Sequence, residues 1–208
     1  SAVLIAVGAH EGKRLPIPGA DHPDVLINTR FLRDVRLGKG PDLKDRHVLV
    51  LGGGNVAIDC ARTAVRLGAG QVDVACLESR ETAPAARHEI KEAEEEGVTL
   101  HASRSFTRIL TAHGRVTGVE AVKASFMRFE PDGTLTLETV PDSEHVLVCD
   151  TVIFAIGQRA GLAFIPEDAG VGITRQRTIA VNPNTFATSR PGVFAAGDTT
   201  SGTAFVIE

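Results

Sequence analysis

One segment, residues 47–67 (HVLVLGGGNVAIDCARTAVRL), constrains the fold most, because its pattern is that of a strand, a glycine turn and a helix in direct succession. Residues 48–51 form a short apolar run of the kind that is buried in parallel strands. Small and apolar side chains then recur at helical spacing from Val56 to Val65, while charged side chains fall on the opposite face. Between the two lie three consecutive glycines: Gly52, Gly53 and Gly54. This pattern predicts an α/β chain with a Rossmann-like, three-layer domain.

The glycine turn has the spacing G-x-G-x-x-A, with Ala57 at the third position, where a small residue allows close packing of helix and strand. Backbone N–H groups at the start of a helix, helped by its dipole, bind phosphate. The turn therefore predicts a binding site for the pyrophosphate of a dinucleotide. The alternative is a flexible loop between two core elements, and the strand before the turn and the helix after it favour the dinucleotide.

Two charged residues at the end of the next strand bear on which dinucleotide binds. Glu78 lies 26 positions beyond Gly52, close to the spacing at which an acid accepts hydrogen bonds from the adenosine ribose, and this favours NADH. Arg80 could instead pair with the 2′-phosphate of NADPH. Both cofactors stay open, as does the alternative that Glu78 and Arg80 are ordinary solvated loop charges.

The composition excludes several classes of function. At 208 residues with 43% hydrophobic residues the chain can form substantial cores, and a net charge of −4 gives no basic surface for nucleic acid. No apolar run is long enough to cross a membrane. Cys60, Cys76 and Cys149 form no C-x-x-C pair, and the histidines have no metal-ligand spacing, so we expect no metal site. Unpaired cysteines point to a reducing compartment and hence to the cytoplasm.

Three regions are expected along the chain. Residues 1–43 hold a buried strand at 2–9, a connector between domains, and a helix capped by Asn28 or Thr29 that runs through Leu37. Residues 44–160 form the nucleotide-binding domain, with a second helix from Thr82 through Ala93. A β-meander at about 107–148, with turns at 113–114 and 131–133, precedes a strand at 151–156. Residues 161–208 hold a last strand at 192–196. The chain starts at Ser1 on an apolar run, and we expect it to be part of a longer protein.

Five blocks of sequence, in order, carry a resemblance to a known family: AVLIAVGA, VLGGGNVAIDCARTAVRLGA, CLESRETAPAARHEIKEAEEEGV, VIFAIGQ and PGVFAAGDTTSG. They resemble the pyridine nucleotide-dependent flavoproteins, specifically the small subunit of glutamate synthase and its relatives. The resemblance spans nearly the whole chain. It implies an outer FAD domain that is interrupted by an inner NAD(P)H domain with a β-meander, so that this chain would start inside the FAD domain.

The resemblance also implies roles for individual residues. Four would line the NAD(P)H pyrophosphate: Gly52, Gly54, Asn55 and Val56. Three would lie near the cofactor where the domains join: Ala155, Ile156 and Gly157. Gly197 and Asp198 are similar to the family's late flavin motif, in which an aspartate at a strand end binds a sugar-chain hydroxyl of FAD.

Two departures from the family stand out. NADPH-dependent members tend to have paired arginines where this sequence has Glu78 and Ser79. The family's N-terminal FAD fingerprint and its iron–sulfur region are not in this sequence, so we expect the chain by itself to hold FAD poorly.

The implied reaction is hydride transfer from NAD(P)H to FAD, followed by passage of electrons to an iron–sulfur partner or a large subunit. Because the cofactors supply this chemistry, we predict no catalytic acid, base or nucleophile. One alternative is a non-catalytic nucleotide-binding or scaffolding module. A transferase that uses S-adenosylmethionine is a third reading, and the VIFAIG and FAAGD blocks argue against it.

Overall fold

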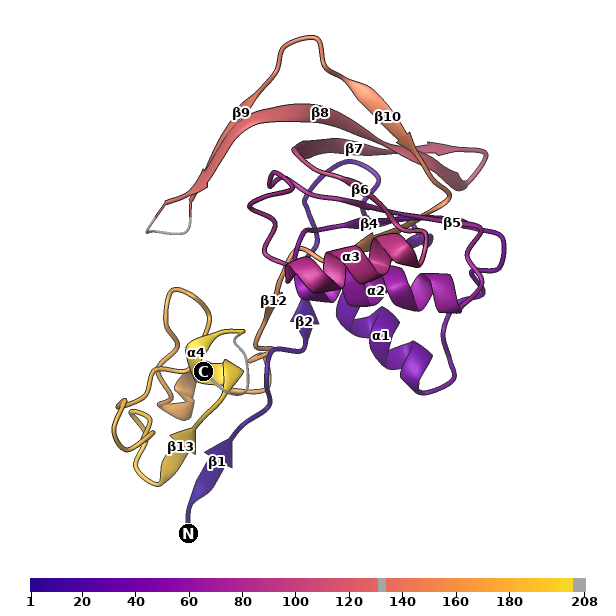
Figure 1. Ribbon diagram of the computed structural model, residues 1–208. Coiled ribbons are helices and arrows are strands. Elements are labelled where there is room, and N and C mark those ends of the chain that lie inside the picture. Colours follow the sequence, from indigo (N-terminus) through magenta and orange to yellow (C-terminus); the bar gives the residue numbers. More distant parts are fainter. Residues whose placement is uncertain (131–133, 204–208) are drawn as a thin grey trace. The chain divides into compact units, whose positions relative to one another are not determined.

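The computed structural model describes residues 1–130 and 134–203, and the chain divides into two compact units (Figure 1). The larger unit is Arg14–Gly157, and the smaller unit joins Ser1–Lys13 to Gln158–Glu208. The sequence led us to expect the nucleotide-binding domain to open near residue 44. The compact unit opens earlier because the segment from Arg14 onward supplies an edge strand and a helix to its main sheet.

A five-stranded parallel sheet forms the middle of the larger unit, in the order β3-β11-β4-β5-β6. Its strands and the helices that connect them are β3 (Val25–Ile27), α1 (Asn28–Arg36), β4 (His47–Leu51), α2 (Asn55–Arg66), β5 (Gln71–Ala75), α3 (Arg87–Glu95), β6 (Thr99–His101) and β11 (Thr151–Phe154). The apolar runs predicted as strands at 48–51 and from 151 are thus two neighbouring, fully buried strands.

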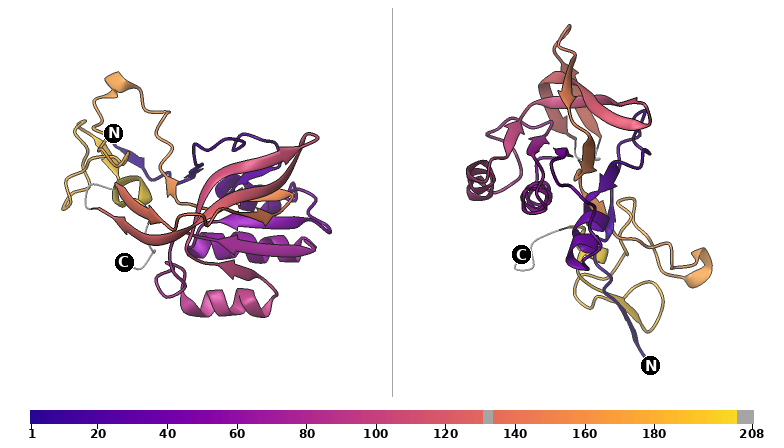
Figure 2. Two further views of the ribbon diagram at one scale, coloured as in Figure 1. Left: turned by 90° about the horizontal axis from the view of Figure 1, so that it is seen from above. Right: turned by 90° about the vertical axis from the view of Figure 1, so that its right-hand side faces the viewer.

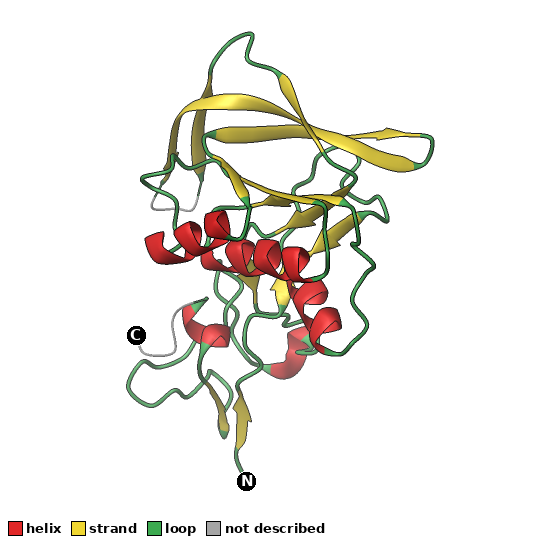
Figure 3. Cartoon of the chain, turned by 45° about the vertical axis from the view of Figure 1, so that its right-hand side comes forward, coloured by secondary structure: helices red, strands yellow, loops and turns green. Residues whose placement is uncertain are grey.

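The three helices cover one face of this sheet, as Figure 3 shows. Val48 and Val50 of β4 point to that face and join a core cluster with Ala57, Ala61 and Ala64 of α2. All five side chains are fully buried. The small residues of α2 let the helix pack closely on the strand that precedes it, as the helical periodicity predicted.

A four-stranded antiparallel meander covers the other face (Figure 2). Its strands are β7 (Arg104–Ala112), β8 (Arg115–Phe129), β9 (Leu135–Thr139) and β10 (His145–Val148). Leu49, Leu51 and Phe154 of the parallel sheet pack against the meander's Val119. This arrangement confirms the predicted three-layer α/β fold, with a meander before the strand that starts at Thr151.

One of the two predicted meander turns can be compared with the structure. His113 and Gly114 connect β7 to β8 with φ values of 52° and 72°, as in the hairpin turns that place both central residues at positive φ. The second predicted turn, Pro131-Asp132-Gly133, lies outside the described residues.

Two of the three predicted helix starts need correction. Asn28 is the first residue of α1, not its cap, and its side chain is fully buried and makes no capping hydrogen bond; Thr29 lies within the helix. The helix α3 starts at Arg87, with Ala86 at its N-cap, so Thr82 and Pro84 belong to the preceding loop. That loop is held by long-range hydrogen bonds described below, which override its local helix signals.

The smaller unit contains short elements: β1 (Val3–Ile5), β2 (Glu11–Gly12), β12 (Gln158–Arg159), a 3₁₀ turn (Glu167–Ala169), β13 (Val193–Ala195) and α4 (Asp198–Ser201). β1 pairs with β13 in parallel, and β12 pairs with β2 antiparallel. The expectation of a buried strand at 2–9 is wrong, since Val3 is 56% and Leu4 is 65% exposed. Within the described residues β1 has a single neighbouring strand, which leaves its apolar side chains uncovered.

Candidate functional site

The glycine turn lies at the point of the sheet where the strand order changes direction. From β4 the chain passes through α2 to β5 on one side, whereas β11 lies on the other side of β4. In open parallel sheets, ligands bind in the crevice outside the carboxyl ends of the strands at such a point. The topology therefore indicates a ligand crevice at the ends of β4 and β11.

The first glycine of the turn packs directly on the loop that follows β11. Gly52 has a φ of +143° and donates its N–H to the carbonyl of Ala75 at 2.8 Å. A Cβ built on Gly52 would overlap the carbonyl oxygen of Ala155 and lie 2.7 Å from its carbonyl carbon. The structure thus brings the predicted residues Gly52 and Ala155 into contact. Ile156 and Gly157 follow Ala155 directly in the chain.

The third glycine lies at the helix start and leaves room for a ligand. Gly54 is the N-cap of α2, with φ of −92° and ψ of 173°, and a Cβ built on it would meet no atom within 4 Å. In the first turn of a helix the N–H groups have no intrahelical acceptor, and they attract anions. Within the described part of the chain, the N–H groups of Asn55 and Val56 meet no acceptor. This end of α2 therefore has the space and the donors that a pyrophosphate needs.

The carboxylate of Glu78 faces the middle glycine. A Cβ built on Gly53 would lie 3.0 Å from Oε2 of Glu78 and 3.0 Å from Cβ of Cys76. The acid predicted from its spacing thus lies beside the glycine turn, where it can accept hydrogen bonds from a ribose bound there.

Arg80 is engaged elsewhere. Its guanidinium donates from Nη1 and Nη2 to the two carboxylate oxygens of Glu94 on α3, at 2.6 Å each. This two-point hydrogen bond is the chief cause of a lowered pKa at Glu94 and of a raised pKa at Arg80. The two charged residues that the sequence left as rivals, Glu78 and Arg80, therefore have different surroundings.

The loop before α3 braces the glycine turn, which sequence reasoning missed. Ala85 donates its N–H to the carbonyl of Gly53 at 2.9 Å, and Ala86 donates to the side-chain Oδ1 of Asn55 at 2.9 Å. The side chain of Asn55 thus holds this loop, and its backbone N–H remains for a ligand. A signal in the sequence is the run of small residues around Pro84, which allows backbones to approach closely.

No thiol in the described residues has the character of a redox centre. All three cysteines are buried and unpaired. Burial raises the pKa of Cys76 to about 12, with the charge of Glu78 adding to the effect, and burial raises the pKa of Cys149 to about 12 as well. Among the residues described, no cluster of His, Cys, Asp and Glu is suited to a metal ion, and no helix there is both long and apolar enough to span a membrane.

The predicted flavin motif lies in the smaller unit. Gly197 follows β13 with a φ of +73°, and a Cβ built on it would meet nothing within 4 Å. Asp198 starts the short helix α4, is half-buried, and has no side-chain partner within the ranges that the structure describes. Gly197 and Asp198 thus provide open space next to a carboxylate at a strand end.

The chain matches the family model described as pyridine nucleotide-disulphide oxidoreductase over residues 1–207. It is 39% identical over 209 residues to the NADP(+)-dependent formate dehydrogenase subunit beta of Moorella thermoacetica. This match covers all of the present chain and 29% of that protein. It is 32% identical over 224 residues to the glutamate synthase (NADPH) small chain of Azospirillum brasilense, covering 99% of this chain and 45% of that protein. The chain thus spans less than half of each relative.

Solved structures of similar fold include Mycobacterium tuberculosis FprA in complex with NADPH. It superimposes with a TM-score of 0.76 at 17% identity, over 99% of this chain and 59% of that one. A second is the thioredoxin reductase of T. acidophilum, with a TM-score of 0.70 at 23% identity over 97% of this chain and 58% of that one. Both likenesses concern the fold.

Proposed function

Since the chain belongs to the pyridine nucleotide-disulphide oxidoreductase family, we propose that it is the NAD(P)H-binding portion of a flavin-dependent oxidoreductase. The observation that carries this proposal is the open start of α2. A Cβ at Gly54 would meet nothing, and the N–H groups of Asn55 and Val56 have no acceptor in the described residues. Space and unpaired donors at a helix start are what a pyrophosphate requires.

The other predicted residues fit the same ligand. Glu78 would accept hydrogen bonds from the adenosine ribose, because its carboxylate lies beside Gly53. The backbone of Ala155, Ile156 and Gly157 would line the crevice at the carboxyl end of β11. When bound, NAD(P)H supplies the hydride, and these residues position it; none of them has to donate or accept a proton.

We further propose that Gly197 and Asp198 contact FAD. The carboxylate of Asp198 has no side-chain partner in the described residues, and the open space at Gly197 lets a ligand approach the backbone closely. Electrons would then pass to an iron–sulfur partner or a large subunit, as the named relatives are themselves subunits or chains of larger oxidoreductases. The unpaired cysteines support a cytoplasmic location.

The proposal is tested by titrating the 208-residue chain with NADH and with NADPH while following nicotinamide fluorescence. The chain has no Trp and no Tyr, so little protein emission competes with the signal. We expect saturable enhancement that ADP-ribose displaces. The proposal would be refuted if the chain is folded, as checked by circular dichroism, and increases the fluorescence of neither NADH nor NADPH.

A second measurement separates electron transfer from binding alone. In a longer chain that includes the FAD fingerprint, we expect NAD(P)H oxidation at 340 nm, and we expect Asp198→Asn to weaken FAD binding there while leaving NAD(P)H binding unchanged. Normal NAD(P)H binding without oxidation, in the presence of bound FAD, would favour the alternative of a non-catalytic nucleotide-binding module.

A further inference from the structure

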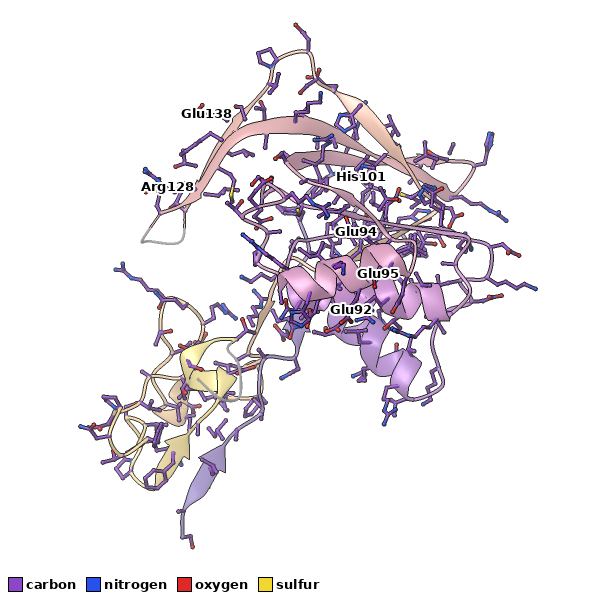
Figure 4. The ribbon with its side chains drawn as sticks, viewed as in Figure 1. Glu92, Glu94, Glu95, His101, Arg128 and Glu138 are labelled. Carbon is purple, nitrogen blue, oxygen red and sulfur yellow. The ribbon has the colours of Figure 1, made fainter. Side chains whose placement is uncertain are left out.

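The residue that competes for Arg80 lies on α3, outside every segment that the sequence assigned to cofactor binding. Glu94 accepts hydrogen bonds from both Nη atoms of Arg80 at 2.6 Å each, and Figure 4 shows Glu94 on the helix next to Glu95. An arginine whose two Nη atoms both bind one carboxylate cannot offer that same pair of N–H groups to a phosphate.

The loop that carries Arg80 is fixed next to the glycine turn. Ala85 and Ala86 bind Gly53 and Asn55 through their N–H groups, and the N–H of Ser79 donates to Oγ1 of Thr82 at 3.1 Å. The adenosine end of a dinucleotide on this turn therefore lies near both Glu78 and the loop that follows it. Arg80 belongs to this loop, two residues after Glu78, and its guanidinium binds Glu94 of α3.

Further cations surround the same place. Arg80 and Glu94 line a surface groove of about 330 Å³ together with Arg87 and Lys91 of α3. Lys91 is paired with Glu95 at 3.4 Å. Glu81 lines the groove as well, so three cationic side chains and two carboxylates meet there.

We infer that Glu94 is a specificity-determining residue, which lowers the affinity for NADPH relative to NADH by occupying Arg80. The inference rests on the proposed function. The 2′-hydroxyl of NADH can donate a hydrogen bond to Glu78. NADH binding therefore leaves the Arg80–Glu94 pair intact. The 2′-phosphate of NADPH has to displace Glu94 before it can bind the same two Nη–H groups of Arg80. Glu94 acts through Arg80 and is therefore a positioning residue, with no contact of its own to the cofactor.

The test compares Glu94→Gln with a matched control, Glu95→Gln, in the 208-residue chain. Both variants remove one negative charge from adjacent positions of the same helix, but Glu95 is paired with Lys91 and does not touch Arg80. We expect Glu94→Gln to lower the ratio Kd(NADPH)/Kd(NADH) about three- to tenfold, which is the range for a partly exposed ion pair of two-point geometry. We expect Glu95→Gln to leave the ratio within about twofold of that of the unmodified chain.

A third variant assigns the effect to Arg80. In the Arg80→Gln background, Glu94→Gln should no longer change the ratio, because no guanidinium remains to be released. Equal ratios in Glu94→Gln and Glu95→Gln, or a gain that persists without Arg80, would overturn the inference. Absence of binding of either cofactor to the folded chain would instead refute the proposed function, so the two failures are distinguishable.

Discussion

The first and third glycines of the turn should respond to the same substitution in opposite ways. At Gly52 a methyl group would overlap the carbonyl of Ala155 and would sit on a residue with a φ of +143°. At Gly54 it would meet no atom within 4 Å, and the φ of −92° is open to any residue. We therefore predict that Gly52→Ala damages the fold, whereas Gly54→Ala damages ligand binding.

The magnitudes follow from the geometry. A backbone conformation accessible almost only to glycine costs of order 1–3 kcal/mol in another residue, and overpacking a tight contact costs about 1–3 kcal/mol more. Gly52→Ala should thus lower the free energy of unfolding by about 4 kcal/mol, a large part of the 5–15 kcal/mol that is typical of a domain. At Gly54, alanine is a poorer N-cap but stiffens the unfolded chain, so the net change in stability should stay within about 1 kcal/mol.

Urea denaturation followed by circular dichroism at 222 nm measures the stability difference. The three long helices, α1 to α3, all belong to the larger unit, so their signal reports the unit that contains the glycine turn. NADH titration measures the second effect. We expect Gly54→Ala to weaken NADH binding about tenfold or more, because the added methyl group occupies the space of the pyrophosphate, and tenfold corresponds to about 1.4 kcal/mol.

Three results would contradict this reasoning. If Gly52→Ala were as stable as the unmodified chain, the close approach of Gly52 to Ala155 would not exist in solution. If Gly54→Ala were as unstable as Gly52→Ala, the space at Gly54 would be filled by the protein itself. If Gly54→Ala bound NADH normally, the pyrophosphate would not lie at the start of α2.

Further predictions concern the thiols, the acid response and the core. Because burial raises the pKa of Cys76 and Cys149 to about 12, Ellman's reagent at pH 8 should label them only after unfolding. The hydrogen bond from Arg62 lowers the pKa of Glu96, so the pair stabilises the fold above the ordinary glutamate pKa of about 4.3 and this stabilisation is lost as the pH falls through the lower, folded-state value. Arg62→Gln should accordingly flatten the loss of urea resistance on acidification. Phe154→Ala should cost about 3–5 kcal/mol in the same denaturation assay, since Phe154 is fully buried between the sheet and the meander.

The sequence predicts those parts of the fold that depend on a single local pattern. Residues 48–51 and the helix after them are recognised by apolar runs and helical periodicity, and both occur as expected. The edge strand at Val25–Ile27 escapes such reasoning, because three apolar residues after a proline resemble a connector. Its assignment depends on pairing with β11, more than 120 residues later in the chain, which no local pattern reveals.

The same division applies within the candidate site. The glycine turn and the start of α2 consist of backbone, and a strand, a turn and a helix that follow one another directly fix their geometry. Side-chain surroundings depend on residues that are brought together from elsewhere. The loop at 82–86 contains a threonine and a proline, which signal a helix start, yet the N–H groups of Ala85 and Ala86 bind Gly53 and Asn55.

Arg80 shows what this division means for predicting cofactor choice. From the sequence, Glu78 and Arg80 are two charges of opposite sign, two positions apart, and either could meet the ribose. The structure separates them through Glu94, which is 14 positions beyond Arg80 and belongs to α3, one residue past the predicted end of that helix at Ala93. A rule that predicts the cofactor from the residues that follow β5 therefore has to include the side chain with which each of these residues is already paired. Glu94→Gln would leave the guanidinium of Arg80 without its two-point partner, so a prediction of cofactor choice has to consider residue 94 together with Glu78 and Arg80.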